Sequence, residues 1–329
     1  MDWLDSHKEA NIIITTHHKP DADALGSSLG LHNFFKEQGY NSTVISPTDY
    51  PSFLNWMPGE TEVINFEKQE NKALEILKNG HIIFCLDFND LKRINELGKH
   101  VAELPLIKVL IDHHQEPEGF DDFRLWTTKA GSTAQLVYEF ISEWKGKDKI
   151  SQKSADCLYA GIMTDTGSFR FDSVTAETHR ITADLIELGA RNASIHQLIY
   201  DQFTHDRLRF IGFCLYEKLH IIKQYNTALM YISKEELAKF NIQTGDTEGL
   251  VNYGLSIEGI ELSALIIDRT KLVKMSFRGK GKFPCNKFAK EYFEGGGHFS
   301  AAGGQSTDTL ENTVNKFRSS LENYKEYLK

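Results

Sequence analysis

Short apolar runs alternate with amphipathic segments through the first half of the chain. The runs are almost continuous in Ile, Val, Leu and Phe, which is typical of strands buried on both faces of a parallel sheet. The expected strands are 11–16, 43–46, 80–87 and 107–112. Between the first two, residues 24–38 carry apolar side chains at helical spacing and end before Gly39. This alternation predicts a doubly wound, mainly parallel α/β domain.

The pattern changes in the second half of the chain. Helices are expected at 151–161 and 176–188, and residues 193–219 have a long helical pattern. Further on, the expected strands are 220–223, 228–233, 262–268 and 272–277, and the expected helices are 234–239, 285–293 and 310–327. We therefore expect an α/β domain at 1–192, a helical linker at 193–219, and a smaller α+β domain with a partly antiparallel sheet at 220–329.

Composition and charge narrow the class of protein. The chain has 329 residues, of which 40% are hydrophobic and 25% charged, which excludes a mainly disordered or fibrous protein. A formal net charge of −9 disfavours a protein that tracks long nucleic acid. The four cysteines are widely spaced and are expected to be reduced thiols. With no apolar run near ~18 residues and no signal-like start, we expect a cytoplasmic protein without a membrane span.

Imidazole and carboxylate side chains recur where the expected elements end. One cluster follows the first strand, two more end later strands, and the last follows the helix expected at 151–161. In chain order the candidates are His17, Asp21, Asp23, Asp87, Asp112, His113, His114 and Asp165. Ligands of open α/β sheets bind beyond the carboxyl ends of the strands. We therefore expect the four clusters to meet at one edge of the sheet.

The number of candidates indicates more than one metal ion. Six of them, His17, Asp21, Asp23, Asp87, His113 and Asp165, are too many for one catalytic metal with open positions. Two metals about 3.5–4 Å apart that share a bridging carboxylate fit better, with a water between them as the nucleophile. Imidazole and carboxylate ligands suit Mn²⁺, Fe²⁺ or Zn²⁺. No cysteine belongs to the set, which disfavours a structural zinc site.

Several motifs together carry a family resemblance. They are His17–Ser27, Asp87 with Arg93, Asp112–His114, Gly161–Arg170, Ser276–Arg278 and the glycine-rich stretch Gly295–Gly303. With these motifs the chain resembles the DHH/DHHA1 phosphoesterases, and among them the short nanoRNase and pAp-phosphatase group. The resemblance covers nearly the whole chain, and the motifs follow the family's order.

The resemblance implies roles for individual residues. One metal would be held by His17, Asp21 and Asp87, and the other by Asp23, Asp87, His113 and Asp165, with Asp87 bridging. The implied catalytic residues are Asp87, His114 and Asp112, of which Asp112 orients its neighbouring histidines. The implied substrate-binding residues are His114, Arg170, Ser276, Arg278, Gly296, Gly297 and His298. The glycines are expected to form an anion-binding nest, and Arg170 is either a phosphate clamp or a surface charge.

The implied activity is hydrolysis of short nucleotides by a two-metal-activated water. The metals are expected to be Mn²⁺, and the substrates are nanoRNA oligonucleotides, 3′-phosphoadenosine 5′-phosphate, or both. A distal anchor in the second domain favours short substrates, because a longer strand has no basic track to follow. The alternatives are a phosphodiesterase for linear or cyclic dinucleotides, a noncatalytic nucleotide sensor, and an RNA-binding module. A homodimer is left open as the oligomeric state.

Overall fold

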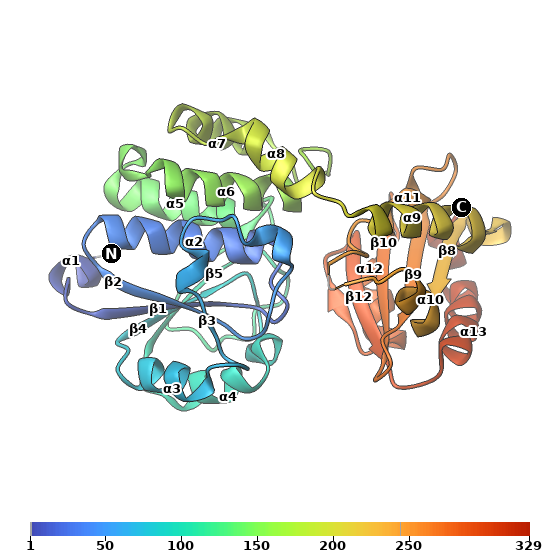
Figure 1. Ribbon diagram of the computed structural model, residues 1–329, viewed down its shortest axis with the longest axis horizontal. Helices are drawn as coiled ribbons and strands as arrows, with labels where there is room; N and C mark the ends of the chain where they lie inside the picture. The colour runs from blue at the N-terminus through green and yellow to red at the C-terminus, as the bar shows by residue number, and fades with distance from the viewer. Residues whose placement is uncertain (1, 244) are drawn as a thin grey trace. The chain divides into compact units, whose positions relative to one another are not determined.

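The chain divides after Gln202 into two compact units, each with its own sheet and its own hydrophobic core (Figure 1). The computed structural model describes residues 2–243 and 245–329. Within those residues, no helix is both long enough and apolar enough to cross a bilayer.

The first unit is built on a parallel sheet. Within residues 2–202 its strands are β1 (Asn11–Thr16), β2 (Asn41–Ser46), β3 (Ile64–Asn65), β4 (Ile82–Leu86), β5 (Ile107–Asp112) and β6 (Phe123–Trp126). They lie in the order β3-β2-β1-β4-β5-β6, and each neighbouring pair is parallel. This confirms the expected doubly wound domain. The sequence analysis missed β3, which has two residues, and β6, an edge strand whose side chains are mostly exposed and form no buried apolar run.

Helices cover both faces of this sheet. Figure 1 shows α2 (Ala22–Glu37), α5 (Thr133–Lys145) and α6 (Gln152–Asp165) on one face and α3 (Glu70–Lys78) and α4 (Glu96–Glu103) on the other. The remaining helices are α1 (Asp2–Ser6), α7 (Ala176–Glu187) and α8 (Asn192–Tyr200). Close contact between α2 and α6 depends on glycine. A β-carbon at Gly26 would lie 2.5 Å from the Cys157 carbonyl oxygen, and one at Gly161 would lie 2.7 Å from Asp23 Oδ1.

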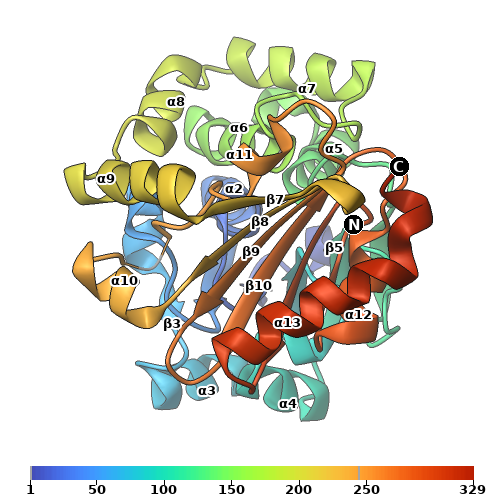
Figure 2. The same cartoon turned by 90° about the vertical axis from the view of Figure 1, so that its right-hand side faces the viewer.

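The second unit has a mixed sheet, in agreement with the expected α+β fold. Its described strands are β7 (Leu219–Ile222), β8 (Thr227–Ile232), β9 (Leu262–Asp268), β10 (Val273–Gly279), β11 (Gly296–Gly297) and β12 (Ala301–Ser306). Only β8 and β9 run parallel among these strands. The helices are α9 (His205–Phe213), α10 (Lys234–Lys239), α11 (Asn252–Leu255), α12 (Cys285–Tyr292) and α13 (Leu310–Ser320). Figure 2 shows α12 and α13 along this sheet, where their apolar faces form the larger core of the unit.

The helical segment expected at 193–219 is interrupted in the structure. Helix α8 ends at Tyr200, and α9 begins at His205 after Thr204, whose side chain accepts from Arg207 N–H. A threonine hydroxyl that satisfies a free helical N–H starts a new helix, and this local bond is invisible to apolar periodicity. The helix expected at 310–327 likewise stops at Ser320 and continues as 3₁₀ turns.

Candidate metal centre

The candidate ligands of the first unit lie where the strand order of its sheet reverses. Strands β1 and β4 are neighbours, but the chain leaves β1 toward β2 on one side and leaves β4 toward β5 on the other. Such a switch point leaves a crevice at the carboxyl ends of the two strands. The segment after β1, the residue after β4 and the residues after β5 therefore meet there, as the sequence predicted.

One group of donors joins the first two segments. His17, Asp21 and Asp87 each place one ligand atom within 4.8 Å of the others. His17 Nε2 lies 3.4 Å from Asp87 Oδ2 and 4.0 Å from Asp21 Oδ2. Both His17 and Asp87 are buried, while Asp21 is half-buried at the start of α2.

A second group lies on the other side of Asp87. It consists of Asp23, His113 and Asp165, whose ligand atoms are also within 4.8 Å of one another. His113 Nε2 lies 3.3 Å from Asp165 Oδ2, 4.0 Å from Asp23 Oδ2 and 3.5 Å from Asp87 Oδ1. Since Asp87 Oδ2 faces His17 and Oδ1 faces His113, the two oxygens of one carboxylate point toward the two groups.

The backbone at Asp87 is in the left-handed region. Its φ of 66° places it there immediately after β4, and its N–H donates to the Ile111 carbonyl oxygen at 3.1 Å. Residues other than glycine adopt this conformation at a cost of about 1–2 kcal/mol, with aspartate among the better tolerated. With this backbone, the Asp87 carboxylate lies between His17, which follows β1, and His113, which follows β5.

Each histidine at the centre is held through its Nδ1 atom. His17 Nδ1 lies 2.8 Å from the His18 carbonyl oxygen, and His113 Nδ1 lies 3.3 Å from the Ala130 carbonyl oxygen. His114 Nδ1 donates to Asp112 Oδ1 at 2.7 Å. For His17 and His113, a carbonyl acceptor requires the proton on Nδ1 in the neutral ring, so Nε2 carries the lone pair that can bind a metal.

Helix α5 supplies contacts that the sequence analysis did not anticipate. Thr133 N–H and Ala134 N–H donate to the two oxygens of Asp23 at 2.7 and 2.9 Å, and Thr133 Oγ1 donates to Asp87 Oδ1 at 2.8 Å. The first turn of a helix is a natural place for a carboxylate. Ser132, whose side chain accepts from Gln135 N–H, is the capping signal that could have located this helix.

Burial and mutual repulsion give the carboxylates opposite proton affinities. Burial, followed by the charges of Asp87 and Asp165, raises the pKa of Asp23 well above its ordinary value. Burial also opposes ionisation of Asp87, but hydrogen bonds from His113 and His17 outweigh it and hold the pKa of Asp87 well below its ordinary value. Burial lowers the proton affinity of His113, yet its hydrogen bond to Asp87 and the nearby carboxylates raise its pKa well above normal.

These pKa shifts show that the carboxylates of the site carry more negative charge than its histidines can balance. Protons on Asp23 and on the histidines would offset part of that charge. Divalent cations would do the same while using the Nε2 and carboxylate lone pairs that converge there. The buried donors of the two groups, with Asp87 between them, therefore fit a pair of divalent metal ions.

Other residues quoted in the family resemblance are placed around this centre. His18 N–H and Nδ1 bond to the Arg93 carbonyl oxygen at 2.7 and 2.9 Å, which ties the first motif to the segment after Asp87. Arg170 Nε donates to the Gly167 carbonyl oxygen at 2.7 Å. This bond closes a turn in which Gly167, Ser168 and Phe169 all have positive φ. The contact braces the turn that follows Asp165, and the role of Arg170, a phosphate clamp or a surface charge, stays a prediction.

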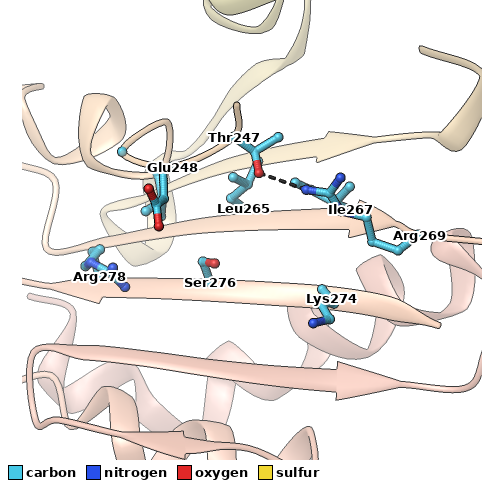
Figure 3. Close-up of a pocket in the computed structure, with 10 residues that line it drawn as sticks. Thr247, Glu248, Leu265, Ile267, Arg269, Lys274, Ser276 and Arg278 are labelled. Carbon is cyan, nitrogen blue, oxygen red and sulfur yellow. Dashed lines mark hydrogen bonds between the residues drawn. The ribbon is translucent and has the colours of Figure 1, made fainter. Parts of the chain in front are cut away.

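In the second unit, Ser276 and Arg278 line a pocket of about 170 Å³ over β9 and β10. Figure 3 shows Arg278 near Glu248 at one end and Lys274 toward the other, with Ser276 between them. Arg269 Nη2 donates to Thr247 Oγ1 at 2.8 Å (Figure 3). Alternate residues of β10 thus put two cations and a hydroxyl along one side of the pocket.

The glycine-rich stretch forms a hairpin and not an open loop. Gly296 and Gly297 pair with β12, and His298 N–H donates to the Ala301 carbonyl oxygen at 2.7 Å. The His298 N–H is thus used within the hairpin, while an anion-binding nest at the glycines stays a prediction. Glycine is needed here for close packing: a β-carbon at Gly295 would lie 2.1 Å from the Gly303 carbonyl oxygen. The pocket lining does not include Gly296, Gly297 or His298.

Comparisons with known proteins agree with the division of the chain into two units. The model of the DHH family, N-terminal domain, matches residues 11–162, and that of the DHHA1 domain matches residues 224–328. The first stretch contains all the ligand candidates except Asp165, and the second contains the pocket residues on β9 and β10.

Whole-chain relatives extend the similarity. The chain is 30% identical to the bifunctional oligoribonuclease and PAP phosphatase NrnA of Thermus thermophilus, over 90% of this chain and 84% of that protein. It is 27% identical to the Bacillus subtilis protein of the same name, over 89% of this chain and 88% of the relative. A crystal structure of an exopolyphosphatase-related protein from Bacteroides fragilis is 39% identical, with a TM-score of 0.94 over 99% of this chain and 95% of the other.

Proposed function

The chain belongs to the DHH family, with a DHHA1 domain in its second unit, and we propose that it is a metal-dependent phosphoesterase of short nucleotides. The observation that carries this proposal is the pair of donor groups that share the Asp87 carboxylate at the switch point of the first sheet. The names of the relatives from Thermus thermophilus and Bacillus subtilis, both oligoribonucleases and PAP phosphatases, support the substrate class.

We assign one metal to His17, Asp21 and Asp87 and the other to Asp23, Asp87, His113 and Asp165. Mn²⁺ suits this mixture of imidazole and carboxylate donors, which contains no thiolate. When bound, the two cations supply an activated water and compensate the charge that develops on the phosphate oxygens. The chain's own contribution is to hold the ligands in place before substrate arrives.

His114 is proposed to contact the phosphate that is hydrolysed. Its Nδ1 is bonded to Asp112, and the same atom lies 3.7 Å from Asp87 Oδ1, so the ring stands at the margin of the ligand cluster. A buried carboxylate that accepts from Nδ1 fixes both the orientation of the ring and its tautomer. With Nδ1 so occupied, the rest of the ring can stabilise charge on a non-bridging oxygen.

In the second unit, Ser276 and Arg278 are proposed to bind a phosphate of the substrate distant from the scissile bond. Arg278 offers a planar fork for phosphate oxygens, Ser276 adds a hydroxyl, and Lys274 adds a second cation along β10. Anchoring of such a phosphate favours short substrates, since a chain with a formal net charge of −9 offers a longer strand no general basic track.

The test is hydrolysis in Mn²⁺ over a length series. The substrates are 3′-phosphoadenosine 5′-phosphate, a linear and a cyclic dinucleotide, a pentanucleotide and a twenty-mer RNA, each with and without a chelator. We expect rates that fall with length and that vanish without metal. Equal rates on the twenty-mer would identify a general exonuclease and reject the anchored short-substrate enzyme. A preference for the cyclic dinucleotide would establish the alternative phosphodiesterase, and tight nucleotide binding without turnover would establish the sensor.

A further inference from the structure

Trp126 braces the loop that carries His114. It is the last residue of β6, the edge strand of the first unit's sheet. Its indole Nε1–H donates to the backbone carbonyl oxygen of His114 at 2.6 Å. In the sheet register Trp126 lies opposite Asp112, which holds the His114 ring at 2.7 Å. His114 is therefore fixed twice, at its ring by Asp112 and at its backbone by Trp126.

The same tryptophan keeps an accessible surface. Trp126 is 37% exposed, although Asp112 and His114 are both buried. An indole with its N–H bonded inward and part of its ring in solvent has an apolar surface available for contact. In a parallel pair, side chains of opposite residues lie on the same face of the sheet, and Trp126 lies opposite Asp112 at the carboxyl end of β6. The indole therefore lies on the same face of this sheet edge as Asp112, which holds the His114 ring.

The segment that starts at Trp126 continues along the centre to helix α5. Its Ala130 carbonyl oxygen lies 3.3 Å from His113 Nδ1, and Thr133 donates to both Asp23 and Asp87. The segment thus contacts the ligand cluster at its inner end and presents the indole at its outer end.

We propose that Trp126 positions His114 and also provides the stacking surface for the base next to the scissile phosphate. This inference rests on the proposed function, since a nucleotide is the substrate that presents a base at that place. Stacking on one aromatic ring changes nucleotide affinity by roughly tenfold and accepts any base, because every base has a π-face. The site would then select nucleotides over base-free phosphate esters without selecting a particular base.

The stacking role is tested with Trp126→Leu on matched dinucleotides that carry a base or an abasic unit at the scissile position. On the normal dinucleotide we expect KM to rise about tenfold. On the abasic substrate wild type is already weakened, and the substitution should change KM less than about twofold, because the partner of the ring is absent. An equal rise in KM on both substrates would overturn stacking.

The positioning role is tested with Trp126→Phe, which keeps an aromatic ring and removes the N–H donor. We expect kcat to fall about five- to tenfold on both substrates while KM stays near the wild-type value, as for the loss of one hydrogen bond to the catalytic loop. The matched control is Trp144→Phe, which removes an indole donor to Asp5 Oδ2 at the far end of α5 and should leave both constants unchanged. A wild-type kcat for Trp126→Phe would overturn positioning.

The outcomes separate this inference from the proposed function. If wild type hydrolyses nucleotides and the Trp126 variants behave like the control, the proposed function stands and the inference fails. If wild type binds nucleotides without hydrolysis, the same base and abasic pair is compared by equilibrium titration, where loss of the base effect in Trp126→Leu supports stacking. If Trp126→Leu changes the oligomeric state, the ring belongs to an interface between copies and the inference fails.

Discussion

At the metal centre of the first unit the charged side chains touch one another, whereas in the pocket of the second unit they are spaced along a strand. His17, Asp23, Asp87 and His113 are each less than 8% exposed and share contacts within 4.0 Å. The pocket instead places Lys274 and Arg278 four residues apart on β10, with Lys274 exposed and Arg278 half-buried. One region is a preassembled cluster, and the other is a row of separate contacts.

The difference has an energetic consequence. Buried charges without partners cost several kcal/mol, so removing one member of the metal centre disturbs the rest of the cluster. Removing one of the partly exposed cations of the pocket changes the free energy of its neighbours little, because water replaces the missing contact. Changes at the centre should therefore act mainly on kcat and on metal affinity, and changes in the pocket mainly on KM.

The largest effect is expected for Asp87→Asn. Asparagine tolerates the left-handed backbone of this position and keeps the shape of the side chain, but it removes the charge that both donor groups share. A loss of several kcal/mol in transition-state stabilisation lowers kcat by at least about 1,000-fold. The measurement is kcat on the best short substrate at saturating Mn²⁺.

The control for this change is Asp90→Asn, three residues further along the chain. Asp90 caps a 3₁₀ turn by accepting from Lys92 N–H and is not part of either donor group. It should retain wild-type kcat. An Asp87→Asn protein with more than a tenth of the wild-type kcat would contradict the bridging role.

A smaller loss of kcat is expected for Asp112→Asn. Asp112 contacts His114 but belongs to neither of the donor groups assigned to a metal. Outer residues that orient a metal-site histidine contribute about 10- to 100-fold, so we expect kcat to fall by that factor with little change in KM. Asp156→Asn is the matched control, because Asp156 is equally buried and pairs with Arg191 away from the centre. It should lower the unfolding temperature without changing kcat, and equal kcat losses in both variants would reduce Asp112 to a structural role.

The pocket is tested by Arg278→Ala. A charge-assisted hydrogen bond contributes about 1.5–3 kcal/mol, and half-burial favours the lower end, so KM for a 5′-phosphorylated dinucleotide should rise about tenfold. The unphosphorylated dinucleotide and kcat should change much less. Arg318→Ala on α13 removes an arginine of the same unit outside the pocket and serves as the control. A fall in kcat with unchanged KM would show that the two regions are not separable.

The sequence predicted the metal centre better than the pocket for a physical reason. Candidate ligands such as Asp87 and His113 follow buried strands, and the order of parallel strands brings their ends together. Lys274 lies within β10, and Arg269 follows the end of β9. Cations are common at such positions in any protein, so the spacing of these two residues does not indicate a binding site. Only Ser276 and Arg278 were anticipated there, and only by family resemblance.

Within the first unit, the residues that were missed are those whose role depends on tertiary contact. Neither Thr133 nor Trp126 is a candidate ligand. Thr133 donates to Asp23 and Asp87, and Trp126 donates to the His114 carbonyl oxygen, contacts that only the folded chain brings together. Periodicity also failed at β6, because an edge strand with exposed side chains lacks the apolar run that reveals β1 and β4. The contacts that refine a site are therefore less predictable than the ligands that define it.

The smallest expected effect is a change in thermal stability. It distinguishes two roles of Asp23, as a metal ligand and as a cap that accepts from the first N–H groups of α5. Folding raises the pKa of Asp23, so the folded chain holds the proton on this carboxyl more tightly than the unfolded chain does. The resulting stabilisation is fully present below the unfolded pKa of about 3.9, and it is lost as the pH rises through the folded pKa. His113, whose pKa is also raised, acts in the same direction above about pH 6.5. Without metal, the first unit should therefore become less stable from acidic toward neutral pH.

Asp23→Asn removes that ionisation while keeping an oxygen that can accept from Thr133 or Ala134 N–H. At pH 7.5 without metal, the variant should unfold a few degrees above wild type, since about 1 kcal/mol corresponds to roughly 2–4 °C for a domain of this size. Thermal scans should show the difference shrinking toward pH 4, and added Mn²⁺ should stabilise wild type more than the variant. The opposite result is a variant that unfolds below wild type without metal and whose unfolding temperature rises as much as that of wild type when Mn²⁺ is added. Asp23 would then be only the cap of α5, and His113 and Asp165 would hold the second metal with Asp87.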